Sequence, residues 1–190
     1  MAIYLKIDGI PGDATHKGHE KWINVDSLQW GAGRAISTPV GSAGKREASE
    51  PSVSEVTMTK SMDTASVKLF QEAVTGAAKD YKIDFISTGD PGDLYLQVEL
   101  TNALISGYSI SSGGDRPSES ISVNFTKVQF KYVDFDQHHK PGTPVIGGYD
   151  LAPAPRRVQH ADHEKRIRAA PALGRPPGPD MTTRRDQLFL

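Results

Sequence analysis

The chain has 190 residues, of which 24% are charged and 7% aromatic, and its formal net charge is −1. This balance excludes a globally basic protein built for nucleic acid or anionic membranes, and no apolar run reaches the roughly 18 residues of a membrane span. The absence of cysteine excludes a disulfide scaffold, a thiolate zinc site and a cysteine nucleophile.

The charge is divided unevenly along the chain. Residues 1–151 hold 14 Lys and Arg against 19 Asp and Glu, whereas residues 152–190 hold 8 against 4 and carry 6 of the 13 prolines. A basic, Pro-rich segment such as 152–190 buries too little apolar surface to offset the loss of conformational entropy when it becomes ordered. We therefore expect an acidic globular domain over 1–151 and a basic, Pro- and Arg-rich, disordered tail over 152–190.

The N-terminal third shows strand patterns. Ile3, Leu5 and Ile7 alternate with polar residues, which predicts a strand rather than a cleaved signal peptide. A second strand is expected over 21–31, with a bend near Asp26-Ser27 because the apolar residues change parity there. The polar segment 37–52 has no periodicity and is expected to form a long extended loop.

One helix is expected in the domain. It follows a strand over 53–60, and its N-cap would be Asp63 or Thr64, while Gly76 would end it. The residues expected to form its core-facing side are Val67, Leu69, Phe70, Ala73 and Val74.

The remaining pattern is again that of strands. A short strand over 81–85 precedes two long ones, over 94–111 and 118–134, which are joined by a hairpin turn at 112–115. The second long strand changes parity near Thr126-Lys127, which indicates a bulge. Long bulged strands coil, and closure removes their exposed edges, so the expected fold is an all-β antiparallel barrel with one lateral helix.

Residue patterns typical of catalysis are weak in this chain. The string at 41–45 lacks the flanking residues and the following helix of a phosphate-binding loop. The pairs His16/His19 and His138/His139 are expected to be surface turn histidines rather than zinc ligands, and the paired acids lie in turns where they are solvated. The residues therefore predict no catalytic site, no cofactor and no metal, and a protein that is not an enzyme.

Taken together, eight motifs resemble the haemolysin-coregulated protein (Hcp) family of bacterial type VI secretion systems. In chain order they are IYLKIDGIPG at 3–12, WINV at 22–25, LQWG at 28–31, VTMTK at 56–60, DTAS at 63–66, GGDRPSESISVNF at 113–125, VQFKY at 128–132 and GGYDL at 147–151. The resemblance covers nearly all of 1–151. The basic tail departs from it, because typical members end soon after the last motif.

The resemblance implies a β-barrel that forms hexameric rings, which stack into an expelled inner tube and carry effectors. It implies partners that are further copies of the chain and the sheath, tip and effector proteins, with secretion through the type VI system and a cytoplasmic location before firing. Gln29 corresponds to a polar side chain facing the tube lumen. The residues implied for the loop that contacts the adjacent ring are Val40, Gly41, Ser42, Ala43, Gly44, Lys45, Arg46 and Glu47.

Two alternatives remain open from the sequence. The first is a monomeric barrel that binds a small ligand, which would require an apolar cavity inside the barrel. The second is an effector-type variant whose activity resides in the tail.

Overall fold

The computed structural model of the chain describes residues 1–37, 47–89 and 92–152. These lie in the first of two compact units, Met1–Pro153 and Ala154–Leu190. The predicted tail therefore lies outside the described residues, except for its first residue, Ala152. The elements of the first unit are β1 (Ala2–Ile7), β2 (Ile23–Val25), β3 (Ser27–Gln29), β4 (Ala32–Gly33), β5 (Ile36–Ser37), β6 (Glu47–Ala48), β7 (Ser52–Val53), β8 (Val56–Ser61), α1 (Ser66–Thr75), β9 (Lys79–Ile86), β10 (Leu94–Ser111), β11 (Ser118–Asn124), β12 (Lys127–Tyr132) and β13 (Val145–Asp150).

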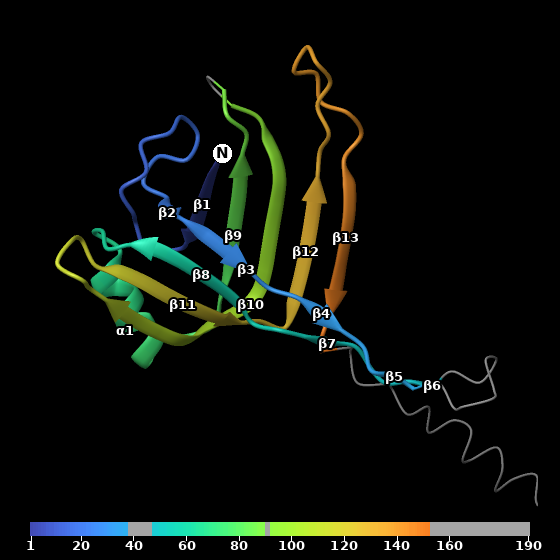
Figure 1. The fold of residues 1–190 in the computed structure, drawn as a ribbon, viewed down its shortest axis with the longest axis horizontal. Helices are drawn as coiled ribbons and strands as arrows, with labels where there is room; N and C mark the ends of the chain where they lie inside the picture. Colours follow the sequence, from blue (N-terminus) through green and yellow to red (C-terminus); the bar gives the residue numbers. More distant parts are fainter. Residues whose placement is uncertain (38–46, 90–91, 153–190) are drawn as a thin grey trace, which may run out of the picture. The chain divides into compact units, whose positions relative to one another are not determined.

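The strands form an antiparallel sheet whose two ends are joined by the chain itself. Its hydrogen-bonded order is β2-β1-β9-β10-β11-β8-β3, with β12 and β13 branching from β10 (Figure 1). The end strands β2 and β3 are consecutive and are separated only by Asp26, whose amide donates to Thr59 O at 2.8 Å. The predicted bend near Asp26-Ser27 is confirmed, and the mainly β, barrel-like fold, with one helix among the described residues, is the expected one.

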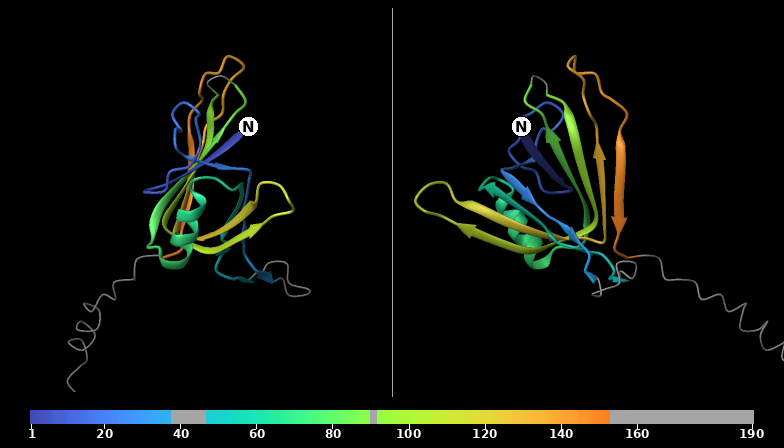
Figure 2. Two further views of the ribbon diagram at one scale, coloured as in Figure 1. Left: turned by 90° about the vertical axis from the view of Figure 1, so that its left-hand side faces the viewer. Right: turned by 45° about the vertical axis from the view of Figure 1, so that its right-hand side comes forward.

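The long strand β10 belongs to two parts of the barrel. Its N-terminal half pairs with β9 and β12, and its C-terminal half pairs with β11 (Figure 2). Between the halves Asn102 has a positive φ of 53°, and Thr126 N–H donates to Thr101 O at 3.1 Å. The expected strand over 118–134 is accordingly two strands. The chain leaves one part of the barrel for the other at Phe125-Thr126, one residue before the expected bulge.

The expectation of a long loop over 37–52 is wrong in part. The chain continues from β3 and returns to β8 as a two-stranded ribbon, in which β4 pairs with β7 and β5 pairs with β6. In Figure 1 this ribbon extends beyond the ends of β3 and β8. The sequence shows no alternation of apolar and polar residues here, because the described side chains of the ribbon are mostly exposed on both faces.

The helix begins later than predicted and buries less. It starts at Ser66 with Ala65 as N-cap and no side-chain cap, while Asp63 accepts a hydrogen bond from Ala65 N–H at 2.9 Å in the turn before it. Gly76 does end it: it is the C-cap, with extended backbone, and its N–H donates to Glu72 O at 2.9 Å. Of the predicted core-facing residues only Leu69 is buried, whereas Val67, Phe70 and Val74 are exposed; the helix itself packs on β10.

Candidate functional site

Of the residues predicted for ring stacking, the structure describes Glu47 alone. Val40 to Arg46 lie outside the described residues. Glu47, the last of the set, begins β6 and pairs in register with Ser37 of β5. The residues on either side of the undescribed segment, Ser37 and Glu47, therefore lie side by side.

Gln29 lies on an exposed face whose strand residues are uncharged, while Glu55, just before β8, lines the same hollow as Gln29 and Thr57. It ends β3 and faces Thr57 of β8, which in turn faces Ser122 of β11 and then Gly107 of β10. Directly opposed residues of antiparallel strands share a face of the sheet. Further outward-facing residues of these four strands that carry a hydroxyl group are Ser27, Thr59, Ser61, Ser118, Ser120, Ser109 and Ser111. We call this set, with Gln29, Thr57, Ser122 and Gly107, the hydroxyl face.

The opposite part of the barrel has a different outer surface. Along β1, β9, β10 and β12 the register aligns Lys6 with Lys82 and Lys82 with Glu99, and it aligns Gln97 with Lys131. Charged residues thus alternate across this surface. The neutrality of the hydroxyl face is therefore a local property in a chain that is 24% charged.

Two separate surfaces expose large apolar side chains. On α1, the side chains of Val67, Phe70 and Val74 are 54–65% exposed. The strand β13 is exposed along its whole length and pairs only with β12 among the described strands; it presents Val145 and Ile146 to solvent. We call these the helix patch and the β13 patch. The sequence predicted neither: the helix side was assigned to the core, and β13 was not expected as a strand.

The prediction that His19 lies at the surface is wrong. Its side chain is buried, and Nε2 lies 2.9 Å from Asp84 Oδ2, whose other oxygen accepts a bond from Gln97 at 2.8 Å. Its ring stacks on Tyr4, with the centroids 5.0 Å apart. This cluster anchors the 8–22 loop to the barrel and contains no nucleophile. Within residues 1–37, 47–89 and 92–152, no group of three or more His, Asp or Glu side chains is arranged to hold a metal ion.

A buried charged cluster links α1 to the barrel, and sequence reasoning missed it. Lys60 of β8 lies between Asp63, at 2.8 Å, and Glu119 of β11, at 2.9 Å. Glu119 also accepts a hydrogen bond from Tyr108 at 2.8 Å. Burial raises the pKa of Tyr108, and so does its bond to Glu119. The only indication in the sequence was the alternation of side chains along each strand, which places Lys60 and Glu119 at core-facing positions.

Comparison with known protein families identifies the family of this chain. The sequence profile of the family described as "Type VI secretion system effector, Hcp" matches residues 4–132. This chain belongs to the Hcp family. Hcp1 of Pseudomonas aeruginosa is similar, with 28% identity over 156 residues that span 78% of this chain and 94% of that protein.

Solved structures of Hcp proteins share the fold. A structure described as a type six secretion system protein has a TM-score of 0.67 and 30% identity, covering 79% of this chain and 95% of the other. Hcp1 of Salmonella typhimurium has a TM-score of 0.63 and 25% identity, covering 79% and 94%. The chain is thus a type VI secretion system protein of the Hcp fold, as its motifs suggested. In the part of the chain that the structure describes, no helix is both long and apolar enough to cross a bilayer.

Proposed function

We propose that this Hcp protein is a structural subunit that forms hexameric rings, and that the rings stack into the expelled inner tube of a type VI secretion system. The tube would carry effectors and contact the sheath and tip proteins. Its subunits would be assembled in the cytoplasm and secreted through the type VI system without a cleaved signal peptide. The family match over residues 4–132 carries the proposal. In this role the protein has no catalytic function.

The two exposed apolar patches support ring assembly. A cyclic ring uses a heterologous interface, in which two different surfaces of each subunit meet. The helix patch and the β13 patch lie on different elements, and exposed large apolar side chains are candidates for an interface. In β13, Val145 and Ile146 point to opposite faces of the strand, so one of them would face a neighbouring subunit on either side. The exposed edge of β13 also offers backbone groups to a neighbouring strand.

The hydroxyl face supports a role as the lumen wall. It includes Gln29, the residue expected to face the lumen, and its members are neutral and small. The strand residues of this wall offer no charge to cargo, so cargo could be held by neutral hydrogen bonds, which are weaker than charge-assisted ones, and still be released. We also propose, from the family resemblance, that residues 40–47 contact the adjacent ring; Glu47, the described member of this set, pairs with Ser37 of β5.

Native mass spectrometry of the full-length chain, combined with negative-stain microscopy, tests the proposal. We expect a sixfold mass and six-fold rings at micromolar concentration, with stacks at higher concentration. A single monomer mass over a wide range of concentration and salt would contradict ring formation and would favour the monomeric ligand-binding barrel instead.

A further inference from the structure

An apolar cavity of about 470 Å³ lies at the end of β12, outside the main core cluster of the barrel. Its lining residues come from β10, from β12 and from the segment that connects β12 to β13. They are Leu94, Gln97, Lys131, Val133, Phe135, Pro141, Gly142 and Pro144. A volume of this size falls within the range of small-molecule sites, which are mostly apolar with a few convergent polar groups.

The apolar walls of this cavity are held by the turn beyond β12. Val133 and Phe135 alternate as half-buried residues among exposed neighbours, so both point to the same side. The turn is closed by a hydrogen bond from Gly142 N–H to Asp134 O at 2.8 Å. His139 Nδ1 lies 2.6 Å from Asp93 Oδ2, which ties this turn to the residue preceding Leu94. The walls are therefore fixed by contacts in the protein itself.

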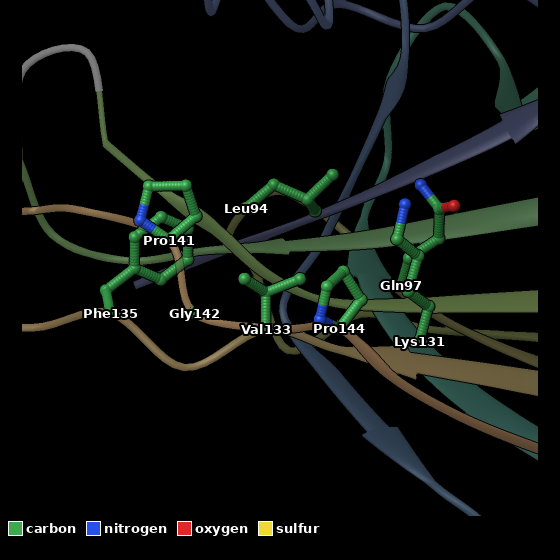
Figure 3. Close-up of a pocket in the computed structure, with 8 residues that line it drawn as sticks. All are labelled: Leu94, Gln97, Lys131, Val133, Phe135, Pro141, Gly142 and Pro144. Atoms are coloured by element: carbon green, nitrogen blue, oxygen red, sulfur yellow. The ribbon is translucent and has the colours of Figure 1, made fainter.

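The cavity has one polar end. Figure 3 shows Gln97 and Lys131 at one side, with Phe135 and Pro141 at the other. Gln97 and Lys131 are opposed in the β10–β12 register, so both side chains leave the same face of the sheet. The amide nitrogen of Gln97 donates to Asp84 at 2.8 Å, whereas Lys131 forms no salt bridge with any described residue.

We propose that this cavity binds a small amphipathic monocarboxylate, whose aliphatic or aromatic body packs between Val133, Phe135 and the prolines while its carboxylate pairs with the ammonium of Lys131. The charge complementarity selects an acid over a neutral apolar molecule. Glu99 stands two residues beyond Gln97 and lines a neighbouring polar hollow with Lys131. Its carboxylate forms no salt bridge with Lys131, but its negative charge near the cavity opposes the binding of an anionic ligand. The proposal does not depend on ring assembly.

Titration calorimetry with octanoate as the probe tests the site on the full-length protein. We expect saturable binding of octanoate at neutral pH and binding of 1-octanol that is about tenfold weaker, because the alcohol lacks the charged contact. Lys131→Met should remove this preference, so that both probes bind equally weakly. Glu99→Gln should instead tighten octanoate binding a few-fold, which a merely structural role of this residue would not do.

Matched controls separate this site from unspecific adsorption. Lys127→Met removes an exposed lysine from the same strand, four residues from Lys131, and should leave both affinities unchanged. A diazirine analogue of octanoate should label the peptide over 133–144 upon irradiation. Equal affinity for octanoate and octanol in the native protein, labelling elsewhere, or no saturable binding up to about 5 mM would each overturn the proposal.

Discussion

Lys60 and Glu119 form an ion pair of 2.9 Å in which neither side chain has any exposed surface. They come from neighbouring strands, β8 and β11, and are directly opposed in register. A buried pair of this kind adds little stability over apolar residues of the same size, but removing one partner leaves an unpaired charge in the core. Because Asp63 and Tyr108 contact the same pair, the cluster fixes the turn before α1 against the barrel.

Lys60→Met is expected to lower the free energy of unfolding by about 3–5 kcal/mol, because it leaves Glu119 buried without a cation. Adding Glu119→Leu to this variant should restore part of the loss. The measurement is urea unfolding followed by circular dichroism, with Lys127→Met as an exposed-lysine control within about 0.5 kcal/mol of the native protein. Additive effects of the two substitutions would show that the pair does not act as a unit.

The acid stability of the protein should depend on Glu119. Burial by itself would raise the pKa of this carboxyl, but the hydrogen bonds from Ser66, Lys60 and Tyr108, together with the charge of Lys60, hold it below the ordinary value of 4.5. A depressed pKa contributes stability that is present above the unfolded value and is lost as the pH falls through the folded one.

The native protein should therefore lose stability below about pH 4.5 more steeply than Glu119→Gln does. Unfolding free energies measured at half-unit steps from pH 6 to pH 3 provide the slopes. The variant is less stable throughout because it has lost the charge pair, so the comparison concerns the slope alone. Parallel curves would contradict the assignment.

If the helix patch and the β13 patch meet in the ring, each single substitution should block assembly. Val74→Lys in the first patch and Ile146→Lys in the second each replace an exposed apolar side chain, which should leave the folded subunit intact. Each variant alone should be monomeric in native mass spectrometry.

A mixture of the two variants provides the sharper measurement. Each variant keeps one intact surface, so a Val74→Lys subunit and an Ile146→Lys subunit can form a single interface and should yield heterodimers but no rings. Rings formed by either variant alone would show that its patch lies outside the interface. Monomers in the mixture would show that the two patches do not contact each other.

Charges placed on the hydroxyl face should make assembly depend on salt if this face lines the lumen. Ser120→Lys would bring six like charges together in each ring, and their repulsion is screened as the Debye length falls to about 8 Å at physiological ionic strength. We expect fewer rings than in the native protein at low salt and recovery at high salt. Ser120→Asn should behave like the native protein, and a salt-independent Ser120→Lys ring would place this face away from the lumen.

The separation between a barrel domain and a basic tail remains a prediction that truncation can check. A chain ended after Leu151 should form rings as well as the full-length chain, because the family match ends at residue 132 and the last motif at 151. Native mass spectrometry of both proteins at equal concentration gives the comparison. Loss of rings upon truncation would show that the tail contributes to assembly.

The alternation of side chains by itself determined most of the strands. A strand with one buried face repeats every two residues, so β1, β9 and β10 were visible in Ile3, Tyr81 and Val98 and their neighbours. The ordered motifs also pointed to the Hcp family before any geometry was known. These signals are local, and each can be found within a window of a few residues.

Only the tertiary structure decided which surfaces became interior. Val74 has the spacing of a core residue but is exposed, whereas Lys60 and His19 are polar but buried. Strand β13 escaped prediction because its exposed residues show no alternation. Burial depends on pairing between residues far apart in the chain, and Lys60 meets Glu119 across 59 positions. The sequence thus predicts the strands, whereas the exposed patches, the hydroxyl face and the cavity depend on how the strands assemble.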